Sequence, residues 1–355
     1  MPNEILILSP FHLPNHGGAE TFLENLEQEA KKCHHITVLT YQPLQKCTLK
    51  YEESYYPKGS INIYRMNWWF KPGNVWKGVS LRNAFLVFPK MALLSLCLLM
   101  KKRYKIVHGQ GLLSGLIAVL LKKIFRCKAY ITLLALYEFK DKPQWFQSIC
   151  RWIFLNSDCV FVEGLSGEQD MWSCFYSKLK HMGDIKKFKV NVKQFNHWVD
   201  QSIFYPPENR PNDKIRVLFI GRPIPEKGKH IVEEAERLLN DKEKYEFIYV
   251  EDVEYKDLPH YYQMADICVV PSLYSEGYSR VVAESASCGC AVITSDRGSL
   301  PEMVRGWGAI FNSTVRGLID TIEFADHKKG QFQSIEYSKQ KFSKKNSEVF
   351  INAYN

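Results

Sequence analysis

Several features that mark particular classes of protein are missing from this sequence. Its ten cysteines include no CxxC pair and no cysteine–histidine grouping with zinc spacing, which argues against a disulfide framework and against a zinc module. No basic segment precedes the first apolar run, Ile5 to Leu8, so no secretory signal is expected. We therefore expect reduced thiols and a cytoplasmic location.

A long uninterrupted apolar run is also missing. The most apolar stretch, residues 84–100, has 17 residues, is broken by Pro89 and Lys90, and is followed by Lys101, Lys102 and Arg103. A membrane span needs about 20 apolar residues. The stretch therefore predicts a helix that packs on a sheet or lies at a membrane surface.

Acidic residues are absent from one long part of the chain. Between Glu53 and Glu138 there is no Asp or Glu, whereas 14 of the 47 lysines and arginines fall there, from Lys58 to Lys128. The remaining 33 basic residues face 38 acidic ones, so the net charge of +9 comes from this stretch. A strongly basic region attracts anions such as phosphorylated substrates, anionic lipid or nucleic acid.

What the sequence does contain is an alternation of apolar runs and amphipathic stretches, which is typical of βαβ units with parallel sheets. The alternation restarts after a proline-rich segment at 204–213. We predict two α/β domains, residues 1–203 and 204–333, with a final amphipathic segment at 334–355. Open parallel sheets bind ligands beyond the carboxyl ends of their strands, so a cleft between the domains is expected. Strands are predicted at 5–9, 36–41, 61–65, 106–109, 129–133, 159–163, 217–221, 247–250, 267–271 and 291–295.

Three segments carry candidate chemistry. Gly17-Gly18-Ala19-Glu20 joins the first strand to the first helix, where a helix N-terminus could hold phosphate, although a tight strand-to-helix turn is the commoner reason for a glycine pair. In the second domain, Arg222 follows a strand and Lys227 precedes a helix, and both cations suit a diphosphate. Solvated loop cations are the alternative interpretation.

The third segment holds two glutamates eight residues apart. Glu276 lies in a loop, and a helix predicted to begin near Tyr278 carries Glu284. Eight helical residues cover about 12 Å, roughly the reach from a sugar past two phosphates to a ribose. Backbone N–H groups at the start of the helix could hold the phosphates between them. A capped amphipathic helix with a surface glutamate is the plainer alternative.

Taken together, these motifs resemble the family-4 retaining glycosyltransferases of GT-B fold (glycosyl transferases group 1). The resemblance is dense over 217–305 and patchy over 5–305. It includes Asn196 to Asp200, which is similar to the family's NGVD element, and a terminal segment similar to the helix that returns to the first domain. The matching residues are Gly17 to Glu20, Gly221-Arg222, Glu226-Lys227-Gly228, Ala265-Asp266, Pro271-Ser272, Glu276-Gly277, Glu284, Gly289, Ser295-Asp296 and Pro301-Glu302.

The resemblance implies an α/β GT-B fold with two Rossmann-like domains facing a cleft, an N-terminal acceptor-binding domain and a C-terminal domain that binds a nucleotide-sugar. Arg222 and Lys227 would neutralise the donor diphosphate, Glu276 would hold sugar hydroxyls, and Glu284 would bind the ribose. No cofactor or metal would be needed. The remaining donor contacts implied are Gly17, Gly18, Gly277, Tyr278, Ser279 and Val281, several of them through backbone N–H groups.

The sequence departs from the family pattern in three places. Ser279 stands where a glycine is usual. No histidine occurs from Ile131 to Glu138, where the family often has one near its catalytic site, so Glu138 or His108 is a candidate substitute. About 15 residues separate Val250 from Ala265, where the family usually has a further helix and strand. The last region helps to recognise the base, so the nucleotide stays open.

The predicted function is transfer of a sugar, with retention, from a nucleotide-diphosphate sugar to a hydroxyl of a glycan or lipid-linked acceptor. The alternatives are a nucleotide-sugar 2-epimerase of the same fold and a catalytically silent nucleotide-sugar-binding protein. Residues 58–128 combine tryptophans with cations, which also suits an anionic membrane surface at the inner leaflet. No nucleic-acid-binding module is evident, and no nucleic-acid partner is predicted.

Overall fold

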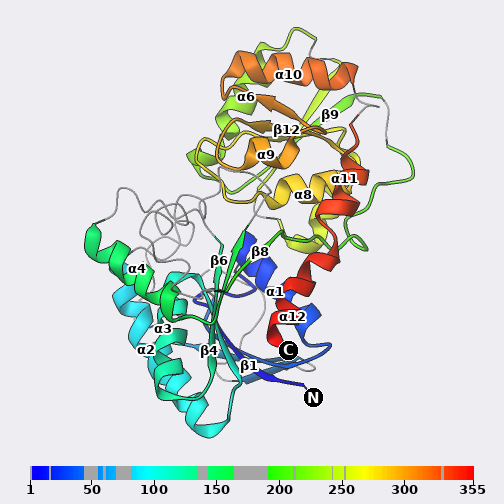
Figure 1. The fold of residues 1–355 in the computed structure, drawn as a ribbon. Coiled ribbons are helices and arrows are strands. Elements are labelled where there is room, and N and C mark those ends of the chain that lie inside the picture. Colours follow the sequence, from blue (N-terminus) through cyan, green and yellow to red (C-terminus); the bar gives the residue numbers. More distant parts are fainter. Residues whose placement is uncertain are drawn as a thin grey trace. The chain divides into compact units, whose positions relative to one another are not determined.

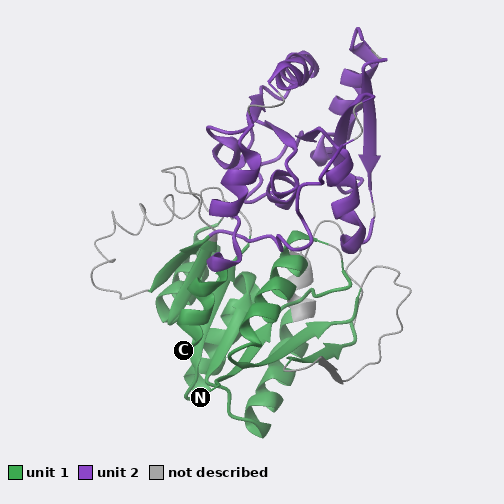
Figure 2. Cartoon of the chain, turned by 90° about the vertical axis from the view of Figure 1, so that its right-hand side faces the viewer, with its two compact units in different colours: residues 1–164, 168–195, 347–355 green, residues 165–167, 196–346 purple. Residues whose placement is uncertain are grey.

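The computed structural model describes residues 2–15, 17–43, 55–58, 61–68, 81–134, 143–163, 191–210, 213–241, 243–251, 253–328 and 332–355. These residues form two compact units, coloured separately in Figure 2. Unit 1 contains the described residues up to 163, residues 191–195 and Ser347–Asn355, and unit 2 contains the described residues of Asn196–Asn346. The chain passes between the units after Phe195 and after Asn346. The predicted divisions were after residues 203 and 333.

Unit 1 is built on a sheet whose described strands have the order β3-β4-β2-β1-β5-β6-β7-β8 (Figure 1). All neighbours are parallel except β3 and β4. Successive strands run outward on both sides of β1 and β5, so the direction of winding reverses between these two strands. The bounds are β1 (Glu4–Leu8), β2 (His35–Tyr41), β3 (Tyr55–Lys58), β4 (Ile61–Met66), β5 (Ile106–Gln110), β6 (Lys128–Leu133), β7 (Cys159–Glu163) and β8 (Val192–Phe195).

Helices cover both faces of this sheet. Right-handed crossovers put α2 (Leu81–Lys101), α3 (Gly111–Ile124) and α4 (Gln144–Asn156) on one face, and α3 packs against both of its neighbours. On the other face α1 (Gly18–Ala30) packs against α12 (Glu348–Tyr354). There Phe22, Phe195 and Phe350 form an aromatic cluster with ring centroids 4.9 to 5.6 Å apart. Both faces of the parallel strands are therefore buried, as the continuous apolar runs predicted.

Unit 2 has a parallel sheet of order β10-β9-β11-β12-β13 among its described strands (Figure 1). In chain order this is 2-1-3-4-5, so winding reverses between β9 and β11. The strands are β9 (Ile215–Ile220), β10 (Tyr245–Val250), β11 (Ile267–Val270), β12 (Ala291–Ser295) and β13 (Ala309–Phe311). The helices are η2 (Pro225–Lys227), α6 (Lys229–Leu238), η3 (Tyr255–Asp257), α7 (Leu258–Met264), α8 (Arg280–Ser287), α9 (Leu300–Val304), α10 (Val315–His327) and α11 (Ser334–Lys341).

The C-terminal segment is divided between the units. Helix α11 packs against α8, and the fully buried Phe342 that follows it belongs to the core of unit 2. After η5 (Lys344–Ser347), α12 joins unit 1, where Phe350 and Tyr354 are fully buried. The predicted return of a C-terminal helix to the first domain is confirmed for α12, whereas α11 stays with unit 2.

Among the described residues, no helix is both long enough and apolar enough to cross a membrane.

Candidate functional site

The loops that follow β9 and β11 meet at the point where the winding of unit 2 reverses. The backbone N–H of Leu273 donates to the carbonyl of Glu226 at 2.8 Å. Gly228 has φ +76°, and a Cβ added there would lie 2.1 Å from the carbonyl oxygen of Pro271. Only glycine satisfies both conditions. The Gly221–Gly228 loop and the Pro271–Glu276 loop are therefore held together by direct backbone contact.

This contact brings two predicted site residues into a buried ion pair. Lys227 Nζ lies 2.5 Å from Glu276 Oε1, and the Glu276 side chain is only 5% exposed. Ser272 Oγ donates to the same carboxylate oxygen, and the Tyr274 ring centre is 5.1 Å from the ammonium. Burial alone would lower the pKa of Lys227, but the facing Glu276 carboxylate and the Tyr274 side chain together outweigh it, so the pKa is raised. The Lys227 ammonium and the Glu276 carboxylate thus lie in direct contact between the two loops.

The backbone of Glu276 is also fixed. Its carbonyl accepts hydrogen bonds from the N–H of Ser299 at 2.9 Å and from Ser299 Oγ at 3.0 Å. Gly298, with φ +57°, allows this approach, because a Cβ there would lie 2.5 Å from the same carbonyl oxygen. Ser299 Oγ also donates to the carbonyl of Gly277. Rigid loops therefore present the carboxylate, as preorganised binding groups require.

The following segment differs from expectation at its start. Helix α8 begins at Arg280, two residues later than predicted, with buried Ser279 in extended conformation before it. The Ser279 N–H donates to Met303 Sδ at 3.3 Å and does not point freely outward. The first N–H groups of α8, including Val281, lack intrahelical partners by helix geometry. Tyr278 stacks on His197 at 4.2 Å between ring centroids.

Glu284 is buried within α8 and is held on several sides. Its Oε1 accepts from Arg280 Nε and Nη2 at 3.0 and 2.8 Å, and its Oε2 accepts from the Tyr262 hydroxyl at 3.0 Å. Arg280 Nη2 also donates to Tyr255 Oη at 2.7 Å. Burial raises the pKa of Glu284, and the Arg280 cation offsets part of this increase. Glu284 therefore lies in a polar network, not on a surface.

Arg222 lies between β9 and η2 and is partly exposed. Its carbonyl accepts from the N–H of Ile224 at 2.7 Å, and the preceding Gly221 donates to the carbonyl of Val250 at 3.2 Å. These bonds place Arg222 at the carboxyl end of β9, in the loop that ends with Lys227. The predicted residues Arg222, Lys227, Glu276, Gly277, Tyr278, Ser279, Val281 and Glu284 all belong to unit 2, and Gly17 and Gly18 belong to unit 1.

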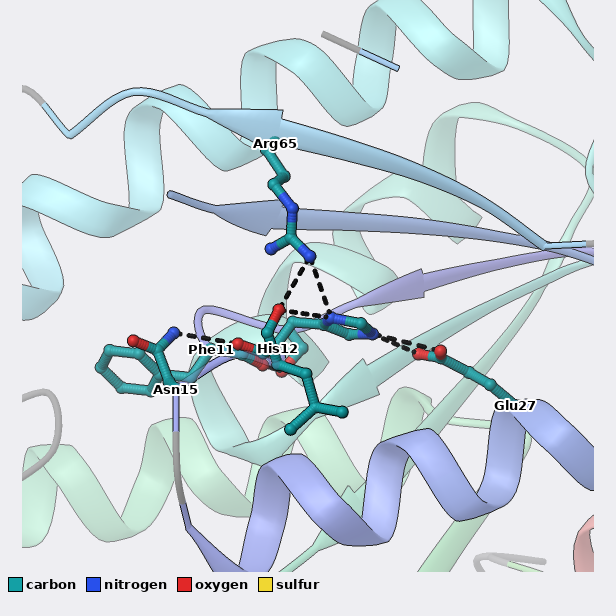
Figure 3. A network of polar contacts seen from close by, with 7 residues as sticks. Phe11, His12, Asn15, Glu27 and Arg65 are labelled. Carbon is teal, nitrogen blue, oxygen red and sulfur yellow. Dashed lines mark hydrogen bonds and ion pairs between the residues drawn. The ribbon is translucent and has the colours of Figure 1, made fainter. Parts of the chain in front are cut away.

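In unit 1 the loop between β1 and α1 is fixed by a buried network (Figure 3). His12 Nε2 lies 3.0 Å from Glu27 Oε1 on α1, and Arg65 on β4 donates to the carbonyl of Leu13 at 2.7 Å. Asn15 Nδ2 donates to the carbonyl of His12 at 3.0 Å. Burial lowers the pKa of His12, but Glu27 more than compensates and the pKa is raised. The network holds the loop that leads to Gly17 and Gly18 at the start of α1.

Sequence reasoning overlooked Gln110, the last residue of β5. Its side chain is 7% exposed, and neither its Nε2 nor its Oε1 has a hydrogen-bond partner in the described part of the protein. Continuing the β1–β5 register places it beside Ser9, where the winding of unit 1 reverses. A buried unsatisfied amide costs about 1–3 kcal/mol, so Gln110 calls for a ligand or water. The only signal in the sequence was its place between an apolar strand and Gly111.

Of the two candidate substitutes for the missing histidine, His108 is wrong. It is fully buried, Nδ1 lies 2.6 Å from Tyr354 Oη, and Nε2 lies 2.7 Å from Thr132 Oγ1. Burial lowers the pKa of His108 to about 3, so the ring stays neutral and structural. Glu138 lies outside the described residues. Within the described ranges, no group of three or more His, Cys, Asp or Glu side chains could hold a metal ion.

Comparison with solved structures defines the fold. Sucrose-phosphate synthase from Thermosynechococcus elongatus superposes with a TM-score of 0.73, with 18% identity over 98% of this chain and 97% of that one. Anabaena HepE in complex with UDP gives 0.66, with 12% identity over 99% and 98%. The catalytic domain of starch synthase IV from Arabidopsis thaliana, bound to ADP and acarbose, gives 0.68, with 12% identity over 100% and 99%. The chain has the GT-B fold of these proteins.

Part of the chain also matches a known family. Residues 177–325 match the family described as glycosyl transferases group 1. Among curated proteins, spore coat protein SA of Bacillus subtilis (strain 168) is 38% identical over 56 residues, which is 16% of this chain and 15% of that protein's length. The group 1 segment includes Arg222, Lys227, Glu276 and Glu284. The matched segment covers less than half of the chain and lies within a chain that has the GT-B fold.

Proposed function

We propose that this protein transfers a sugar, with retention, from a nucleotide-diphosphate sugar to a hydroxyl of a glycan or lipid-linked acceptor. The C1–O bond to the donor diphosphate breaks, and a C1–O bond to the acceptor oxygen forms on the same face of the sugar. The acceptor proton goes to the departing diphosphate oxygen, so no external base and no cofactor is required.

The buried Lys227–Glu276 pair at the β9–β11 reversal carries this proposal. The carboxyl ends of strands at such a reversal are where open α/β sheets bind ligands. When a diphosphate arrives, the Lys227 ammonium can bind its oxygens while Glu276 accepts from hydroxyls of the sugar. Arg222, in the same loop, adds a planar fork for the diphosphate. The chain's own cations thereby neutralise the leaving group.

The nucleoside end of the donor is proposed to lie along α8. N–H groups of its first turn, including Val281, face the diphosphate together with Gly277 and Tyr278, and Glu284 accepts from the ribose. For this, a ribose hydroxyl must join or replace Arg280 at the carboxylate. The donor contacts predicted for Gly17 and Gly18, which belong to unit 1, stay a prediction. Relatives hold UDP or ADP, so the base stays open.

We assign the acceptor to unit 1. Gln110 offers one donor and one acceptor group with no partner among the described residues, at the strand ends where its sheet reverses. An amide with free donor and acceptor capacity suits a hydroxyl-rich glycan, because each sugar hydroxyl can both donate and accept.

The first experiment is thermal stabilisation of the full chain by UDP-, GDP-, ADP- and CMP-sugars. A donor at about 100 times its dissociation constant should stabilise by roughly 2.7 kcal/mol. Lys227→Ala and Arg222→Ala should each abolish most of this gain. Lys229→Ala is the matched control, because Lys229 stands two residues away and pairs with Glu233 and Glu251 instead.

Each result has a distinct meaning. Stabilisation by one nucleotide class that is lost in both site variants and kept in the control supports the donor site. Turnover of that donor without an acceptor would make the protein an epimerase. No stabilisation by any nucleotide-sugar, with the protein folded, would contradict the proposed transfer.

The acceptor assignment has its own test. Gln110→Leu should raise the acceptor KM about threefold to tenfold, the effect of one or two lost neutral hydrogen bonds, and leave the donor KM unchanged. Thr40→Val is the control, since Thr40 Oγ1 on β2 is also buried without a partner among the described residues. Steady-state kinetics with each substrate varied separately provide the measurement. An unchanged acceptor KM in Gln110→Leu would refute the assignment.

A further inference from the structure

Three neighbouring helices of unit 1 are apolar on their outer as well as their inner sides. In α4 the residues Trp145, Ile149 and Trp152 are exposed and follow one another at i, i+4 and i+7, while Ile153 and Phe154 on the inner side are buried. In α2, Leu93 and Met100 are exposed at i and i+7. A helix that is apolar all round belongs in a core or at a membrane.

The exposure of these side chains is large. Trp145 is 60% exposed, Met100 66% and Ile124 on α3 67%. Because α3 packs against both α2 and α4, their outer sides form one surface (Figure 1). We call it the α2–α4 face. Its exposed large apolar residues are Leu93, Leu94, Met100, Leu120, Ile124, Trp145, Ile149 and Trp152. A continuous apolar surface of this kind marks an interaction site.

The three helices of this face carry positive charge and no acidic residue. Cations gather where α2 and α3 end, beside the first residues of the paired strands β5 and β6, next to Met100 and Ile124. Lys102 and Lys122 at these ends pair with Glu4 and Asp158. Five further exposed cations form no ion pair with a described residue; they are Lys101, Arg103, Lys123, Arg126 and Lys128.

We propose that the α2–α4 face docks on a bilayer surface that contains anionic phospholipid. Tryptophans and long aliphatic side chains enter the headgroup boundary, and the cations next to them bind lipid phosphates. A second copy of this chain fits the face less well, because two such faces would bring like charges together. The proposal does not depend on the sugar chemistry. It adds α4 to the membrane surface that was predicted for residues 58–128.

The docking also has a direction relative to the sheet. Each crossover helix runs antiparallel to the strands it joins, so Trp145 at the start of α4 lies toward the carboxyl edge, where β5 ends in Gln110. A docked unit 1 therefore meets the lipid along the length of these helices, with Trp145 toward the carboxyl edge of the sheet and the cations toward its amino edge.

The test is co-sedimentation of the full chain with vesicles of purely zwitterionic lipid and with vesicles that also contain phosphatidylglycerol. Binding is expected only to the second kind at low salt, and it should weaken as salt shortens the range of charge attraction. Ile149→Ser/Trp152→Ser should reduce the partition coefficient by about tenfold or more. Leu238→Ser/Phe324→Ser, which changes two exposed apolar residues of unit 2, should bind like the unchanged protein.

A second pair of variants tests the charges. Lys123→Gln/Arg126→Gln should lower binding about fivefold for each cation removed, whereas Lys339→Gln/Lys341→Gln, two exposed lysines on α11, should not. Failure of the full chain to sediment with anionic vesicles at low salt overturns the proposal. So does a self-association that analytical ultracentrifugation detects and that Ile149→Ser/Trp152→Ser abolishes, because the face would then join two copies.

Discussion

The two buried carboxylates of unit 2 that are proposed to contact the donor are each paired with a cation. Lys227 neutralises Glu276, and Arg280 neutralises Glu284, all within two short segments. A buried charge without a partner costs several kcal/mol, so each pair keeps its site folded in the absence of ligand. Binding then exchanges one set of ionic contacts for another and does not have to dehydrate isolated charges.

In unit 1, the buried His12–Glu27 pair should make stability depend on pH. The pKa of His12 is raised above its ordinary 6.5, so its stabilising contribution is complete below that value and is lost as pH rises through the higher folded pKa. Urea unfolding over a pH series should show the free energy of unfolding falling in this range, with a slope of at most about 1.4 kcal/mol per pH unit.

Two matched variants test whether the His12–Glu27 pair causes this pH dependence. Glu27→Gln should remove the slope, because an uncharged amide no longer favours the imidazolium facing it beside Arg65. Glu29→Gln is the control, because Glu29 stands two residues further along α1 and pairs with exposed Lys32. This variant should keep the slope of the unchanged protein. A slope that persists in Glu27→Gln would show that another group titrates.

Single residues were predictable where local chemistry defines them. Lys227 stood out because it precedes a helix in the loop that Arg222 begins at a strand end, and Glu276 because it lies in the loop after another strand. The carboxyl ends of parallel strands meet at one edge of the sheet. The pairing of Glu284 with Arg280 follows helix spacing, i to i+4, yet the reach of the helix and the family resemblance had suggested a ribose contact for Glu284. His108 was proposed as a base because a continuous apolar strand does not reveal which of its polar residues is fully buried. Gln110 carries no charge and drew no attention.

At the scale of elements, α12 is fastened to the sheet of unit 1 by aromatic contacts and buried hydrogen bonds. Tyr130 Oη donates to the carbonyl of Ala353 at 2.8 Å, and Tyr354 Oη lies 2.6 Å from His108 Nδ1. Tyr354→Phe removes the hydroxyl that faces His108 Nδ1 and leaves that nitrogen buried without a partner. The free energy of unfolding should fall by about 1–3 kcal/mol. Chemical denaturation measures it, and Tyr337→Phe on α11 in unit 2 is the control. An unchanged stability would mean that water replaces the hydroxyl.

Most strands and helices were predictable because parallel sheets with both faces covered read as regular alternations of apolar runs and amphipathic stretches. The observed β12 matches the predicted 291–295. The division of 334–354 into α11 and α12 was not predictable, because an amphipathic pattern does not specify which core its apolar side enters. The late start of α8 depends on Ser279 N–H donating to Met303, which is distant in sequence.

For the whole molecule, donor binding should protect the two units unequally. Hydrogen exchange with and without the stabilising nucleotide-sugar should slow most in 221–228 and 276–284, because these segments supply the proposed contacts. Exchange in the helices of the α2–α4 face should stay unchanged. Protection confined to unit 1 would contradict the assignment of the donor to unit 2.

The backbone contact between Gly228 and Pro271 has a consequence for engineering. Because no side chain fits between them, residues 221–228 and 271–276 can shift only together, and the spacing of cation and carboxylate is built into that junction. Exchanging one of these loops alone with a related enzyme would mismatch the two halves. A chimera with a new sugar preference should therefore receive both loops, with Gly228 retained, as a single cassette.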